Sequence, residues 1–169
     1  VVLHTVDRGA SWLEQYPGTN ENLSSVFFTS PDSGWVVGTA GAVFHTADGG
    51  TSWSQQNTPL VTDLHDVYFH NNNFGLAIGA KGRVLMAQFG GILWASMELD
   101  MSADLNAAAF TSIHTGWIAG DGGMLLKTEN GGSDWSTREA GTTANLQALY
   151  FLDADKGWAV GDSGRILFT

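Results

Sequence analysis

A 41-residue repeat runs through the chain and constrains its fold more than any other feature. The dipeptides that define it are Gly34-Trp35, Gly75-Leu76, Gly116-Trp117 and Gly157-Trp158. Leucine, phenylalanine and tryptophan series recur with the same spacing and without insertions. A fixed period of about 40 residues is typical of propeller blades and other repeat arrays. We therefore expect one domain, residues 1–169, with repeat boundaries near 5–45, 46–86, 87–127 and 128–168.

Each unit has the pattern of four short strands separated by Gly, Asp or Asn. In the unit that contains Trp35, the expected strands are 23–28, 34–38, 42–46 and 52–56. Stacked helical repeats would need an apolar period of 3.6 residues, which is missing. The sequence therefore predicts an all-β fold, a β-propeller of four-stranded antiparallel blades. The first strand of each unit should be innermost, because it is apolar on both faces.

The two ends of the chain, residues 1–5 and 165–169, both match the third strand of a blade. A ring of four blades would need only one copy of that strand. We therefore favour a segment of a ring of six to eight blades. The alternative is a four-bladed ring that is closed by joining the two ends.

Residues 5–12 and 46–53 follow the pattern T-x-D-x-G-x-S-W, the Asp box, and residues 128–135 are a looser copy. In such a turn the Asp accepts backbone N–H bonds, the Gly takes a conformation closed to other residues, and the Trp packs beneath. Single acids on separate blades cannot converge on a metal or a substrate, so we assign these residues a structural role. The predicted Asp-box residues are Asp7, Gly9, Trp12, Asp48, Gly50, Trp53, Asn130, Gly132 and Trp135.

The series L-x-x-V-x-F, G-W-x-V-G and G-x-I-L-x-T, read with the Asp box, resembles the photosystem II stability and assembly factor-like repeat family. The resemblance covers essentially the whole chain and is clearest in residues 146–169 and 46–53. It implies a scaffold that holds a protein partner in the thylakoid lumen, the periplasm or outside the cell. Members of the family use an arginine-rich surface, whereas this chain has only Arg8, Arg83, Arg138 and Arg165.

Asp boxes also occur in glycoside hydrolases, which gives an alternative function. A sialidase would need three convergent arginines and a Tyr nucleophile, and other glycosidases need two facing carboxylates. No such grouping is visible, and the five histidines lack the spacing of a metal site. We predict a binding protein without enzymatic activity, cofactor or metal. The alternatives are a fragment of a sialidase-like or xyloglucanase-like enzyme and a carbohydrate-binding propeller.

Charge and hydropathy exclude other classes of function. The net charge is −10 with only seven Lys and Arg, so nucleic-acid binding is not expected. No apolar run is long enough to span a membrane. The chain has no Cys, which suits secreted and cytosolic proteins about equally.

The third unit departs from the repeat. Phe89, Ile92 and Leu93 take positions that hold Asp or Asn, then Ala, Thr or Ser, then Ser or Asp in the other boxes, and Leu76 replaces the Trp of the second strand. Exposed apolar residues of this kind often mark a contact site. The alternative is a decayed motif whose side chains fold back over the space left by Leu76. If Phe89 and Ile92 are exposed, the contact-site interpretation is favoured.

Acidic residues are unevenly distributed among the loops. Eight of the 17 lie between the fourth strand of one blade and the first of the next, or between second and third strands, and these loops should share one face. A clustered negative field can steer a cationic partner, or it can serve solubility alone. The predicted acidic face consists of Glu21, Asp63, Glu98, Asp100, Asp104, Asp121, Glu139 and Asp162.

Overall fold

The structure, a computed structural model, describes residues 1–169 and contains β-strands and short 3-10 turns but no α-helix. Three sheets have four antiparallel strands each. Blade 1 consists of β3 (Leu23–Phe28), β4 (Gly34–Gly38), β5 (Val43–Thr46) and β6 (Ser54–Gln55). Blade 2 consists of β7 (Leu64–Asn71), β8 (Phe74–Gly79), β9 (Arg83–Gln88) and β10 (Leu93–Glu98). Blade 3 consists of β11 (Leu105–Phe110), β12 (Gly116–Gly120), β13 (Leu125–Thr128) and β14 (Ser136–Thr137).

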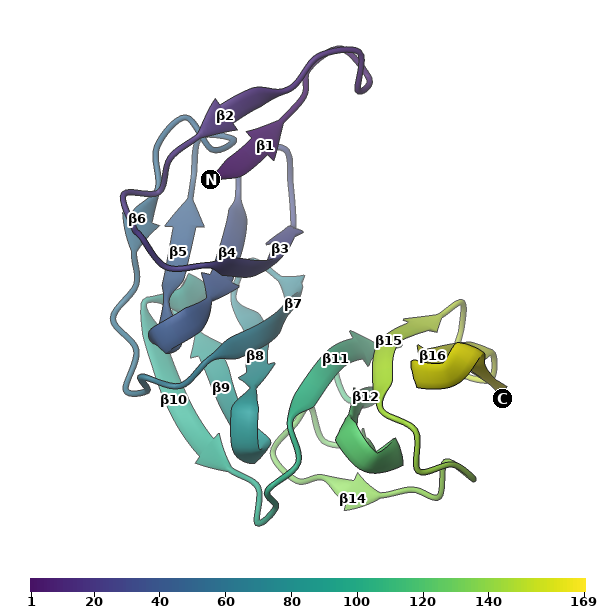
Figure 1. Ribbon diagram of the computed structural model, residues 1–169. Coiled ribbons are helices and arrows are strands. Elements are labelled where there is room, and N and C mark those ends of the chain that lie inside the picture. Colours follow the sequence, from purple (N-terminus) through teal and green to yellow (C-terminus); the bar gives the residue numbers. More distant parts are fainter.

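Two smaller sheets lie at the ends of the chain. β1 (Val2–His4) pairs with β2 (Leu13–Gln15), and β15 (Leu146–Phe151), β16 (Gly157–Gly161) and β17 (Arg165–Phe168) form a three-stranded sheet. The predicted all-β propeller of four-stranded antiparallel blades is confirmed. The two end sheets do not pair with each other and lie apart in Figure 1. The size of the complete ring stays a prediction.

The strands follow the repeat closely, with one difference. β3 and β4 have the expected bounds, but β6 is two residues long, shorter than the expected 52–56. The cause lies in the Asp box, because the Ser52 N–H and hydroxyl donate to the Asp48 carboxylate at 2.8 and 2.6 Å. A residue held by its turn in this way cannot join the ladder of the next strand.

The blades are arranged in an arc, with their first strands side by side along its inner side (Figure 1). This confirms that the first strand of each blade is innermost. Val67 in β7 is buried, whereas its repeat equivalent Val26 in β3 is half exposed. The inner face is therefore covered most completely at blade 2, in the middle of the arc.

The hydrophobic core lies between the blades. The largest cluster joins blades 1 and 2 and includes Trp35, Phe69 and Trp94. A second cluster joins blades 2 and 3 around Leu76, Leu105 and Ile118. Because apolar surfaces of neighbouring blades cover each other, no blade buries its faces alone.

Five 3-10 turns, each three residues long, connect strands: η1 (Thr39–Gly41), η2 (Ala80–Gly82), η3 (Phe89–Gly91), η4 (Asp121–Gly123) and η5 (Asp162–Gly164). None of these helical segments is long and apolar enough to cross a membrane.

Candidate binding surface

The Asp-box turns use their polar groups internally. The Asp7 carboxylate accepts bonds from the Ser11 hydroxyl at 2.6 Å, the Ser11 N–H at 2.9 Å and the Thr5 hydroxyl at 2.8 Å. The bonds from Ser11, followed by that from Thr5, lower the pKa of Asp7 to about 2. Asp48 has the same geometry with Ser52 and Thr46, and its pKa is likewise lowered to about 2.

The looser Asp box of blade 3 works in the same way. The Asn130 side-chain oxygen accepts the Asp134 N–H at 2.9 Å and the Thr128 hydroxyl at 3.0 Å. Its amide donates to the Asp134 carboxylate at 2.8 Å. The polar groups of this turn thus bond to one another, and the structural role of the Asp-box residues stays a prediction.

The third unit has a different turn, η3, between β9 and β10. Phe89 adopts a φ of +53°, which is uncommon for a bulky residue. Its side chain is 70% exposed, that of Ile92 is 82% exposed, and Leu93 is also exposed. These side chains do not fold back over Leu76, and their role as a contact site stays a prediction. Backbone strain and exposed apolar surface together are features of binding sites.

The loop between β7 and β8 adjoins this turn. A Cβ added to Gly90 would lie 3.1 Å from the backbone oxygen of Asn72. Gly75 pairs with Ala87, so Phe74 and Phe89 lie at the same end of the sheet. Phe74 is also exposed. We call the four residues Phe74, Phe89, Ile92 and Leu93 the blade 2 rim.

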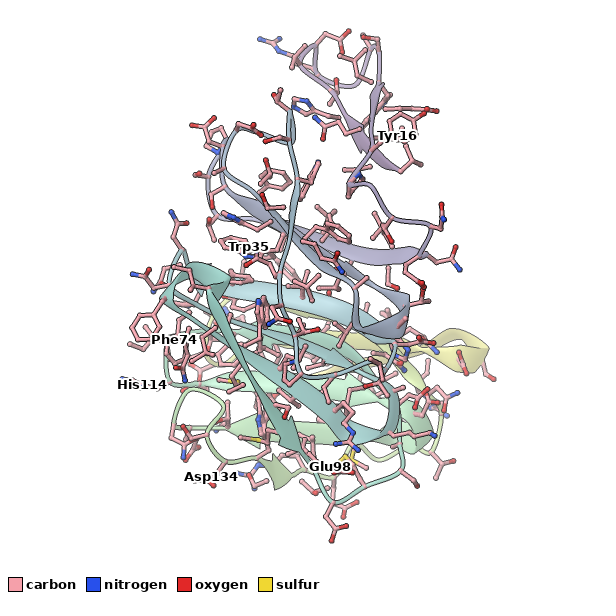
Figure 2. All side chains as sticks on the ribbon, turned by 90° about the vertical axis from the view of Figure 1, so that its left-hand side faces the viewer. Tyr16, Trp35, Phe74, Glu98, His114 and Asp134 are labelled. Atoms are coloured by element: carbon pink, nitrogen blue, oxygen red, sulfur yellow. The ribbon has the colours of Figure 1, made fainter.

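A pocket of about 290 Å³ opens between blades 2 and 3, next to the blade 2 rim. Its apolar wall comes from Tyr68, Phe74, Leu76, Met86, Phe110 and Ile113, and its polar wall from His70, Asn71, Asn73, His114 and Asn130. Phe74 and His114 lie close together on the left side of Figure 2. We call this space the interblade pocket. The replacement of Trp by Leu76 is visible in the sequence, but the pocket could not be predicted from it.

The residues of the predicted acidic face are largely engaged in internal contacts. Asp63 accepts the Ala40 N–H at 3.0 Å, and Asp104 accepts the Lys81 N–H at 2.9 Å, each from the preceding blade. Four more acids have partners: Glu21 with Thr39, Glu98 with Arg83, Asp121 with Asn106, and Asp162 with Gln147. Asp100 and Glu139 make no internal hydrogen bond or ion pair. A role of this face in attracting a partner stays a prediction.

Asp66 was not predicted as a site residue, and it is the most buried of the carboxyl groups with a shifted pKa. It accepts the Ser25 hydroxyl of blade 1 at 2.7 Å and the Ala108 N–H of blade 3 at 2.9 Å. Burial raises the pKa of this carboxyl. No acidic side chain is among its hydrogen-bond partners, so Asp66 links three inner strands and forms no carboxylate pair. The structure contains no group of three His, Asp or Glu placed to hold a metal.

The fold is that of a β-propeller with four-stranded antiparallel blades. The sequence profile of the family described as photosynthesis system II assembly factor YCF48 matches residues 4–65 and 55–141. The chain belongs to this family. No curated protein matches the chain in sequence.

Solved structures share the fold at low sequence identity. YCF48 bound to D1 peptide is 18% identical, with a TM-score of 0.57, over 98% of this chain and 70% of that chain. YCF48 from Cyanidioschyzon merolae is 14% identical, with a TM-score of 0.58, over 98% of this chain and 75% of that chain. An ancestral GH74 enzyme is 16% identical, with a TM-score of 0.74, over 92% of this chain and 24% of that chain.

Proposed function

We propose that this chain is a non-enzymatic scaffolding propeller that binds an extended segment of a protein partner on the blade 2 rim. The observation that carries the proposal is the turn η3. There exposed Phe89 replaces the Asp or Asn of the other Asp boxes, and exposed Ile92 replaces their Ala, Thr or Ser. Exposure of apolar side chains to water is unfavourable in free energy, and a bound partner would cover them.

Family membership supports a protein as the partner. The family is that of an assembly factor, and one similar structure is of YCF48 bound to D1 peptide. A peptide also suits an exposed apolar surface with a pocket beside it. Its side chains can contact the blade 2 rim while one of them fills the pocket, and such anchors contribute most of the affinity at an interface. We place the protein in a thylakoid lumen, a periplasm or outside the cell, as the resemblance to assembly factors implies.

Binding should be tested with two probes, the D1 peptide and a random peptide library displayed on phage. Titration calorimetry would then compare the wild type with the double variant Phe89→Ser, Ile92→Ser. We expect at least a tenfold loss of affinity in the variant, because two apolar anchors are removed. The matched control is Val6→Ser, Val61→Ser, which removes two other exposed apolar side chains and should bind like the wild type.

Two results would contradict the proposal. One is that every peptide that binds the wild type binds the Phe89→Ser, Ile92→Ser variant with equal affinity. The other is release of sugar from xyloglucan or a sialoside by the purified chain, abolished by a single carboxylate substitution. The second result would instead support the hydrolase alternative, for which the GH74 structure provides a shared fold.

A further inference from the structure

The interblade pocket lies where the repeat normally places a tryptophan. Trp35 of blade 1 stacks on Phe69 of blade 2, with ring centroids 3.6 Å apart and an interplanar angle of 12°. Trp117 of blade 3 stacks on Phe151 in the next sheet, at 5.4 Å and 13°. The repeat equivalents between blades 2 and 3 are Leu76 and Phe110. Leu76 has no ring to place against Phe110.

The space left by the missing indole is only partly filled. Phe69, which Trp35 covers, is 2% exposed, whereas Phe110, whose ring stacks on Tyr68 with centroids 5.3 Å apart, stays partly accessible. Met86, the strand neighbour of Leu76, reaches towards Gly132 in the Asp box of blade 3. A flexible thioether adapts to irregular space and to an incoming ring. The remaining volume, about 290 Å³, opens to the surface.

The lining of the pocket selects for an uncharged aromatic group. Its apolar wall includes Leu76, Met86 and Phe110, and its polar wall has amides and imidazoles such as those of Asn73 and His114. None of the 13 lining residues is Asp, Glu, Lys or Arg, although the chain has 17 acidic residues. An ion would find no charge to pair with there. An indole or phenol would bury its ring and keep a polar tip near the amides.

We propose that the interblade pocket binds an aromatic side chain, Trp or Tyr, of the partner protein, inserted where the other blades carry their own tryptophan. That the ligand belongs to a protein rests on the proposed function. Phe74 belongs both to the pocket and to the blade 2 rim, so one segment can contact the two together. An aromatic anchor in a pocket beside exposed apolar contacts is a common arrangement at protein interfaces.

Methionine-methyl NMR of the full chain tests this inference. The chain has four methionines, and only Met86 lines the pocket, which leaves Met97, Met101 and Met124 as internal references. The probe is N-acetyl-tryptophanamide, with N-acetyl-leucinamide for comparison. We expect a saturable shift of the Met86 methyl signal with a dissociation constant on the order of 1 mM, as for a small fragment, and a much weaker effect of the leucine compound.

The variant Leu76→Trp fills the pocket with the residue that the repeat uses elsewhere. It should weaken binding of the probe at least tenfold, whereas Leu152→Trp, which adds a ring at an exposed site outside the pocket, should not. If Leu76→Trp does not fold, nuclear Overhauser effects between the probe and the Met86 methyl of the wild type decide the question.

The inference is overturned if the Met86 signal does not shift, if all four methionines shift alike, or if folded Leu76→Trp binds as the wild type does. Failure of the proposed function has a different signature. In that case the tryptophan probe shifts Met86, but neither the D1 peptide nor any library peptide depends on Phe89 and Ile92.

Discussion

Replacing Trp35 by alanine should lower the free energy of unfolding by about 3–5 kcal/mol, the usual cost of removing a large buried aromatic side chain. Trp35 is fully buried and stacks on Phe69 at 3.6 Å. Its indole N–H has no hydrogen-bond partner, so the loss consists of packing and burial alone. With a urea m-value of about 2 kcal/mol/M, the midpoint should fall by about 1.5–2.5 M.

Trp158 provides the matched control for this substitution. It occupies the same repeat position but is 36% exposed, because no further blade covers it in this structure. Trp158→Ala should therefore cost only about 1–2 kcal/mol, in proportion to the smaller apolar area that it buries. Urea unfolding followed by far-UV circular dichroism measures both variants. Equal losses at the two positions would refute the view that contacts between blades provide the stability.

Three further substitutions test other parts of the structure. Asp48→Asn should reduce thermal stability at pH 7. The ionised Asp48 carboxylate stabilises the fold because its pKa is lowered from 3.8 to about 2 on folding. The difference from the wild type should therefore vanish as pH falls from 3.8 towards about 2. A difference that is independent of pH would contradict this. Phe89→Asp should raise the free energy of unfolding by about 1 kcal/mol in urea titrations, by restoring the acceptor of the Asp box, and should weaken peptide binding. An unchanged affinity would argue against the blade 2 rim. Asp66→Ala should cost about 1–3 kcal/mol, because it leaves the Ala108 N–H without its acceptor, whereas exposed Asp63→Ala should cost less. Similar urea midpoints for these two variants would contradict the linking role of Asp66.

Periodicity accounts for what could be predicted from the sequence. Because each blade repeats the same local pattern, the bounds of β3 and β4 and the position of the Asp-box turns could be derived from residue spacing alone. For Phe89 and Ile92 the sequence left two alternatives open, exposed side chains or side chains folded over Leu76. The outcome depends on whether the side chains can reach the space beside Leu76, which no local pattern specifies.

The features that could not be predicted depend on contacts between repeats. The interblade pocket exists because Met86 fills only part of the space between Leu76 and Phe110, and this depends on side-chain conformations on two blades. The position of Asp66 between Ser25 and Ala108 likewise needs the relative placement of three inner strands. An acid at that strand position has no counterpart in the other units, and this irregularity was the only signal in the sequence.

The most direct test of the account is amide hydrogen exchange of the full chain with and without a bound peptide, either the D1 peptide or one selected from the library. The account predicts slower exchange in the turn at residues 89–93 and in the loop at residues 71–74, with the loops around Asp63, Asp104 and Asp162 unchanged. Slower exchange confined to those acidic loops, with no change in the turn at residues 89–93, would contradict the claim that the blade 2 rim binds the partner.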